Sequence, residues 1–158
     1  MDVDGVLTDG GLWWSADGGE TKRFDYADIM GLSLARRAGL PLALISGEDS
    51  PLVTRLADKL RIGCVAAGCR DKAAALAAFA QECGVALEQV CMVGDDLNDL
   101  PAMALAGFSA APATANPAVC ARVDCVLPAA GGYGAVRLLV DAILAQKEFD
   151  LPALWARR

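Results

Sequence analysis

The chain of 158 residues contains no histidine. This excludes catalysis by a serine or cysteine activated by an imidazole, and it excludes metal sites with mixed cysteine and histidine ligands. The six cysteines form no CxxC pair, and several lie inside apolar runs, where cysteine behaves as a small hydrophobic residue. We therefore expect free thiols and a reducing, cytoplasmic environment.

Long apolar runs and basic clusters are also missing. No segment approaches the roughly 18 apolar residues of a membrane-spanning helix, and the N-terminus lacks the basic and apolar regions of a signal peptide. Lys and Arg number 14 against 20 Asp and Glu, which gives a net charge of −6. Because an acidic chain repels phosphate backbones, we expect neither a membrane nor a nucleic acid as partner.

Hydrophobic residues make up 55% of the sequence, and its length suits a single domain spanning residues 1–158. Short apolar runs alternate with segments of helical pattern, which predicts an α/β fold with a doubly wound, Rossmann-like parallel sheet and no cap domain. The predicted strands are 41–45, 62–66, 90–93, 107–111 and 124–127. The predicted helices are 28–38, 51–60, 71–83, 98–106 and 134–146.

Residues 10–27 interrupt this alternation and read as a β-hairpin with a glycine turn. Adjacent Trp13 and Trp14 would point to opposite faces of the hairpin, so at least one is exposed unless a partner covers it. One alternative is that a tryptophan folds back on its own domain; we favour a subunit interface. The tail at 147–158 is too short and mixed in character to assign.

Two carboxylates, Asp2 and Asp4, stand at the start of the chain just before Gly5. If Asp2 ends a strand and the chain turns at Gly5, both side chains can face one pocket. Such a pair suits a nucleophilic carboxylate with an acid/base partner. Taken alone, acidic residues beside glycine more often indicate a turn.

Further acidic residues follow the predicted strand 90–93, at Asp95, Asp96 and Asp99. Ligands bind at the carboxyl ends of strands in open α/β sheets, so these residues should meet Asp2 and Asp4. Gathering carboxylates is costly without a cation, and an all-oxygen site suits Mg²⁺. The alternative is a helix-capping loop.

Ser46, Gly47 and Lys72 supply hydrogen-bond donors at two other strand ends. Such donors suit phosphate oxygens. Alone, residues 46–47 could be an ordinary turn and Lys72 a solvated surface residue. Together with the carboxylates, they predict phosphoryl transfer through an aspartyl-phosphate.

These segments resemble the four motifs of the haloacid dehalogenase-like phosphatases: residues 2–9, 45–47, Lys72 and 94–99. The resemblance extends to about residue 144. It is closest to the capless subfamily that acts on phosphorylated 2-keto-3-deoxy sugar acids, which shares the hairpin and the segment 131–137.

The resemblance implies a role for each residue. Asp2 would be the nucleophile, and Asp4 would protonate the leaving oxygen and later activate water. Mg²⁺ would be held by Asp2, Asp95 and the Val3 carbonyl. Ser46, Gly47 and Lys72 would bind the phosphoryl group, and the supporting residues would be Thr8, Asp96 and Asp99. The subfamily also implies a homotetramer in which hairpins associate and a neighbour's C-terminal segment covers the site.

Glu48 and Lys59 bear on which phosphorylated sugar acid is the substrate. Octulosonate phosphatases usually carry Arg at the position of Glu48. Glu there, with Lys eleven residues on, is similar to enzymes for 2-keto-3-deoxynononate 9-phosphate, although their intervening Arg appears here as Leu56. We expect the nononate, with 3-deoxy-octulosonate 8-phosphate as the alternative. Glu48 and Lys59 could also be ordinary solvent-facing helix residues.

Only Met1 precedes Asp2, whereas the family has several apolar residues there. We expect that the natural chain begins further upstream; the alternative is that this form is impaired. Two rivals from other classes remain. A receiver domain uses similar groups but places its phosphorylated Asp after a later strand. A non-catalytic phosphatase-like assembly module would tolerate a shortened first strand.

Overall fold

The computed structural model describes residues 1–156. Its strands are β1 (Trp13–Trp14), β2 (Glu20–Thr21), β3 (Ala43–Ile45), β4 (Cys64–Ala66), β5 (Cys91–Val93), β6 (Phe108–Ala111) and β7 (Cys125–Val126). Its helices are α1 (Tyr26–Arg37), α2 (Pro51–Leu60), α3 (Lys72–Cys83), α4 (Leu100–Met103), α5 (Pro117–Cys120), α6 (Ala135–Gln146) and α7 (Leu151–Ala156), with 3-10 turns η1 (Leu87–Gln89) and η2 (Leu97–Asp99).

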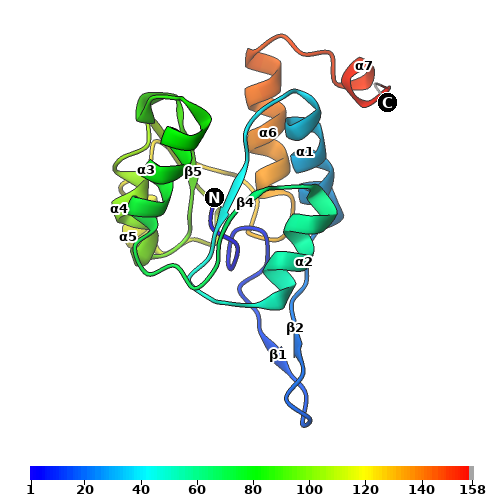
Figure 1. The fold of residues 1–158 in the computed structure, drawn as a ribbon, viewed down its shortest axis with the longest axis vertical. Coiled ribbons are helices and arrows are strands. Elements are labelled where there is room, and N and C mark those ends of the chain that lie inside the picture. Colours follow the sequence, from blue (N-terminus) through cyan, green and yellow to red (C-terminus); the bar gives the residue numbers. More distant parts are fainter. Residues whose placement is uncertain (157–158) are drawn as a thin grey trace.

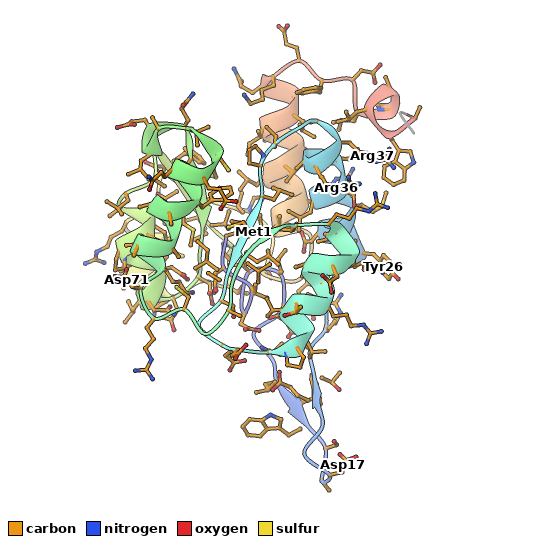
Figure 2. The ribbon with its side chains drawn as sticks, viewed as in Figure 1. Met1, Asp17, Tyr26, Arg36, Arg37 and Asp71 are labelled. Atoms are coloured by element: carbon orange, nitrogen blue, oxygen red, sulfur yellow. The ribbon has the colours of Figure 1, made fainter. Side chains whose placement is uncertain are left out.

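The first two residues join two parallel sheets. Strand β3 pairs with β4, and β5 pairs with β6, which pairs with β7. Met1 N donates to the Ala43 carbonyl at 3.0 Å and its carbonyl accepts from Ile45 N at 2.9 Å, the pattern of a parallel pair. Asp2 N then donates to the Val93 carbonyl at 2.9 Å. Residues 1–2 thus take the central position between β3 and β5, and Figure 2 shows Met1 in the middle of the molecule.

Successive residues of each strand face opposite sides of the sheet, and their side chains belong to two separate hydrophobic cores. Leu44 and Val93 pack with α1, α2 and α6, whereas their neighbours Ile45 and Met92 pack with α3, α4 and α5. Figure 1 shows these two groups of helices on either side of the strands. Apolar side chains on both faces explain the continuous apolar runs in the sequence. The predicted doubly wound α/β fold is confirmed.

The predicted elements agree in kind with the structure, with differences at the ends. Helix 51–60 has the predicted bounds, and every predicted strand is present but shorter. The prediction of one helix over 98–106 was wrong in extent: η2 and the short α4 occupy 97–103. The chain must then turn to Gly107, which lies so close to Glu88 that a Cβ would stand 2.0 Å from the Glu88 carbonyl oxygen. Helices α5 and α7 were not predicted.

The hairpin projects away from the body of the molecule, with Asp17 at its tip (Figures 1 and 2). Its two strands pair over two residues each, Trp13 with Thr21 and Trp14 with Glu20. The prediction of a hairpin reaching residue 27 was too long, because the Asp25 side chain accepts from Ala27 N and starts helix α1. Trp13 is 68% exposed and Trp14 76%.

Residues 1–156 contain no cap domain between the elements of the sheet. The six cysteines are free thiols. In the described part of the chain, no helix has both the length and the apolar character needed to cross a bilayer. In the tail, Leu151–Ala156 form α7, whose Leu154 is buried in the same core as Leu44 and Val93. The last two residues of the tail lie outside the described part.

Candidate active site

Asp2 lies at the carboxyl end of the central position of the sheet, where its side chain is 8% exposed. Lys72 Nζ lies 2.7 Å from Asp2 Oδ1 and 2.6 Å from Asp99 Oδ1. Lys72 is the first residue of α3, and its own side chain is 1% exposed. The Asp71 side chain caps this helix by accepting from Ala74 N. A buried ammonium therefore connects two buried carboxylates that come from distant parts of the chain.

The carboxylates of Asp2, Asp95 and Asp99 form a cluster that could hold a cation, because one oxygen from each lies within 4.8 Å of the others. Asp99 also shapes the loop: its Oδ2 accepts from Asp95 N at 3.0 Å and from Asp96 N at 3.2 Å. Asp96 Oδ1 in turn accepts from Leu97 N. Asp99 therefore orders the loop that carries Asp95 and Asp96.

The electrostatics of this cluster favour a bound cation. Burial, followed by the negative charges of Asp2 and Asp99, raises the pKa of Asp95 to about 7. Burial and the charge of Asp99 also raise the pKa of Asp2, against the opposing effect of Lys72. Burial lowers the pKa of Lys72, but the ion pairs with Asp2 and Asp99 outweigh it and the net shift is upward. Lys72 therefore stays charged, and a cation would relieve the remaining repulsion.

The turn after Asp2 is held by Thr8, which is fully buried. Thr8 Oγ1 accepts from Gly5 N at 3.2 Å and from Gly10 N at 3.1 Å. Thr8 thereby closes the loop that presents Asp4.

The Val3 carbonyl does not fit the role predicted for it. It accepts from the backbone N–H groups of Val6, Leu7 and Thr8, the shortest at 2.8 Å. A carbonyl oxygen has two lone pairs, and these bonds direct the Val3 oxygen into the turn. This bonding argues against Val3 as a metal ligand.

A cavity of about 270 Å³ collects most of the predicted site residues. Its walls are Asp2, Asp4, Gly5, Gly10, Gly47, Glu48, Lys72, Asp95, Asp96 and Asn98. Ser46 is 1% exposed, and its Oγ accepts from Glu48 N at 3.2 Å, so it orders the loop that presents Gly47.

Glu48 and Lys59, predicted together as specificity residues, line different cavities. Glu48 faces the acidic cavity, whereas Lys59 lines a separate cavity of about 410 Å³ between the hairpin, α1 and α2. Lys59 Nζ lies 5.4 Å from the centre of the Tyr26 ring.

Three polar residues at the site were missed from the sequence. Lys22, beyond β2, donates to Asp4 at 2.9 Å and to Glu48 at 2.6 Å. Asn98 lines the cavity, and Asn116 Nδ2 donates to Asp96 at 3.1 Å. Asn116 precedes a proline at the start of α5, a capping signal that the sequence did contain.

Comparison with known proteins identifies the family of the chain. The family model of the haloacid dehalogenase-like hydrolases matches residues 19–107, more than half of the chain. The 3-deoxy-D-manno-octulosonate 8-phosphate phosphatase KdsC of Haemophilus influenzae is 41% identical over 143 residues, which cover 90% of this chain and 79% of that protein. The chain belongs to the haloacid dehalogenase-like hydrolases. Within them it is a phosphatase of the capless sugar-acid group, and this sets aside the receiver-domain alternative.

Solved structures of relatives superpose on most of the chain. The same phosphatase from Moraxella catarrhalis, in complex with magnesium, phosphate and KDO, is 37% identical with a TM-score of 0.89, covering 92% of this chain and 83% of that one. The cobalt-bound Haemophilus influenzae phosphatase is 38% identical with a TM-score of 0.92, covering 99% and 94%.

These relatives change which of the two candidate substrates is favoured. The sequence analysis placed the nononate 9-phosphate first, from Glu48 and Lys59. The named relatives are octulosonate 8-phosphate phosphatases, so the similarity supports the alternative better than the first expectation. The expectation of the nononate assumed that Glu48 and Lys59 act on the substrate as a pair. In the structure these two side chains line separate cavities, which weakens that assumption.

Proposed function

We propose that the chain hydrolyses a phosphorylated 2-keto-3-deoxy sugar acid, with 3-deoxy-D-manno-octulosonate 8-phosphate as the favoured substrate and Mg²⁺ as the cofactor. The observation that carries the proposal is the buried Asp2 carboxylate, placed 2.7 Å from Lys72 in a cavity shared with Asp4 and Asp95. The names of the relatives support the substrate, and the cluster of three carboxylates supports the metal.

Asp2 is the proposed nucleophile. Its carboxylate oxygen attacks phosphorus, so that a bond from Asp2 to phosphorus forms while the bond from phosphorus to the sugar oxygen breaks. Asp4, in the same cavity, gives its proton to the departing sugar oxygen. Asp4 then takes a proton from the water that attacks the phosphorylated Asp2, which releases inorganic phosphate.

Asp2 and Asp95 would hold Mg²⁺, with Asp99 ordering the loop of Asp95. When bound, the ion would offset the negative charge on the carboxylates and the phosphoryl oxygens. Lys72, the Gly47 backbone and the Ser46 loop would hold the phosphoryl group. Asn98 adds an amide in the same cavity.

The nononate 9-phosphate stays a second candidate because Glu48, not the Arg usual in octulosonate phosphatases, faces the cavity. Phosphate release should be measured on both sugar phosphates and on generic sugar phosphates, with and without Mg²⁺. Asp2→Asn is the inactive variant, and Asp58→Asn, an exposed carboxylate on α2, is the matched control. Mg²⁺-dependent turnover of the octulosonate, lost only in Asp2→Asn, is expected.

Preference for the nononate would overturn the substrate and keep the chemistry. Turnover that survives Asp2→Asn would contradict the nucleophile. No turnover of any phosphate ester by the folded protein would favour the non-catalytic assembly module.

We also propose a homotetramer joined through the hairpins. The support is the pair Trp13 and Trp14, whose exposure on a projecting element is unusual for such large apolar side chains. Light scattering of the protein and of a Trp13→Ser/Trp14→Ser variant tests this. A protein that is monomeric before substitution would contradict it.

A further inference from the structure

Lys22 is a buried cation that the reaction scheme above does not use. Its side chain is 2% exposed, although the residue lies on the hairpin, most of whose residues are exposed. Its Nζ is 2.9 Å from the Asp4 carboxylate, 2.6 Å from Glu48 and 3.8 Å from Glu20. Three carboxylates from three segments therefore surround one ammonium.

We propose that Lys22 is a positioning residue for Asp4: it holds the Asp4 carboxylate in the orientation from which proton transfer occurs, and Glu48 holds Lys22 in place. This inference rests on the function proposed above.

The position of Lys22 is itself constrained from two sides. Glu20, two residues earlier, accepts from the Ser50 hydroxyl at 3.0 Å, and Ser50 caps α2. Glu48 lies on the same loop as Ser50. Strand β2, which ends directly before Lys22, is thus tied to the start of α2 independently of Asp4. A lysine fixed in this way can hold the carboxylate of a neighbouring residue in one orientation. A mobile surface lysine would instead move together with that carboxylate.

Lys22 is poorly placed to bind the substrate. Its Nζ already donates to two carboxylates and is shielded from solvent. Burial alone would lower the pKa of Lys22, but the hydrogen bonds to Glu48 and Asp4 outweigh burial and raise it, so the ammonium persists. Lys22 borders the cavity of about 410 Å³ between the hairpin, α1 and α2, whereas Lys72 lines the acidic cavity beside Asp2.

The same geometry gives Glu48 a role other than substrate selection. Its carboxylate is the nearest partner of Lys22, and its own side chain is 54% exposed. Without Glu48, Lys22 would keep Asp4 and the more distant Glu20 as partners, and its position would be less fixed.

The test separates the two half-reactions with p-nitrophenyl phosphate. Nitrophenolate leaves as an anion, so formation of the Asp2–phosphorus bond needs no proton from Asp4. Attack of water on phosphorylated Asp2 still sends a proton to Asp4. A misplaced Asp4 should therefore slow the second step and leave the first, and phosphorylated enzyme should accumulate.

Rapid mixing with Mg²⁺ should compare the unaltered protein with Lys22→Met, Lys22→Arg, Asp4→Asn and Lys147→Met. Lys147 is an exposed lysine after α6 and is the matched control. We expect Lys22→Met to resemble Asp4→Asn, with a burst of about one nitrophenolate per site and a steady-state rate lowered roughly 100-fold. With a sugar phosphate, kcat should fall while KM changes little. Lys22→Arg should recover part of the rate, and Lys147→Met should behave as the unaltered protein.

A Lys22→Met protein with unchanged kcat would overturn the inference while leaving the proposed function intact. Loss of the burst together with the steady-state rate would show that Lys22 supports the whole site, and a change confined to KM would make it a substrate ligand. Either result overturns the inference. Absence of turnover by the unaltered protein would overturn the proposed function and this inference with it.

Glu48→Gln provides a second variant in case Lys22→Met does not fold. It keeps Lys22 and should give the same burst with a smaller loss of steady-state rate. Combined with Lys22→Met, its effect should be less than additive, because both act through Asp4. Additive losses would contradict the link between Glu48 and Lys22.

Discussion

Gly5 lies directly against the carboxylate of Asp95, so that a Cβ on Gly5 would stand 2.0 Å from Asp95 Oδ2. Gly5 also has a φ of +83°, a conformation that other residues rarely adopt. The absence of a side chain at Gly5 therefore lets the turn after Asp2 and the loop after β5 meet at one site.

Replacing Gly5 by alanine should displace Asp95 and weaken both Mg²⁺ binding and turnover. A displacement of about 1 Å in an active site can cost roughly 100-fold in rate. Gly18→Ala is the matched control, because Gly18 has a φ of +85° but nothing within 4 Å of its added Cβ. Mg²⁺ titration and phosphate release should separate the two. Equal activity of Gly5→Ala and Gly18→Ala would contradict the contact with Asp95.

The raised pKa of Asp95 predicts how stability depends on pH. The pKa of Asp95 is about 7 in the folded protein, and its ordinary value is 3.8. Between these two values, the metal-free folded state binds a proton on Asp95 that the unfolded state does not bind. The contribution of Asp95 is therefore greatest below about pH 4 and is lost as the pH rises to about 7.

Mg²⁺ should reverse this loss, because it replaces the proton. Added Mg²⁺ should thus raise the melting temperature more at pH 8 than at pH 5, as measured by thermal unfolding of the metal-free protein. Asp95→Asn should remove most of this difference. A Mg²⁺ effect independent of pH would contradict the prediction.

Lys72→Met should destabilise the metal-free protein by roughly 3 kcal/mol, because it leaves the buried carboxylates of Asp2 and Asp99 without their cation. Denaturant unfolding measures the change. Adding Asp99→Asn to Lys72→Met should restore part of the stability, since one unpaired charge is removed. Lys147→Met, on the surface, should change little. A loss of equal size in both single lysine variants would rule out this explanation.

Asp28 on α1 should matter for stability without touching the acidic cavity. It is 1% exposed, and its carboxylate accepts from Gly134 N at 3.1 Å and Arg137 N at 2.9 Å, so it caps α6 from a neighbouring helix. Asp28→Ala should cost about 2 kcal/mol. Asp58→Asn, on an exposed face of α2, is the comparison. An unchanged unfolding midpoint for Asp28→Ala would argue against the cap.

Most of the candidate site could be predicted because its residues follow strands. Asp2 lies at the end of the central strand position, and Gly47 and Asp95 lie two residues after the ends of β3 and β5. The carboxyl ends of parallel strands lie at the same edge of a sheet. Lys72 begins a helix at the same edge. The alternation of apolar segments was therefore enough to bring these residues together before any contact was known.

The sequence could not show the direction of individual groups. The Val3 carbonyl is adjacent to two site residues, yet hydrogen bonds of the turn direct it elsewhere. Lys22 looks like a solvated hairpin residue but is buried between Asp4 and Glu48. Glu48, in the loop before α2, and Lys59, near the end of α2, are eleven residues apart and line separate cavities.

The sequence by itself determined the α/β alternation and placed the candidate carboxylates at the carboxyl ends of strands, because these depend on local pattern and on one general property of parallel sheets. Only the tertiary structure decided which side chains became buried partners. Burial and charge pairing arise between segments far apart in the chain, such as 22 with 4 and 48, or 28 with 134–137, and no local pattern specifies them.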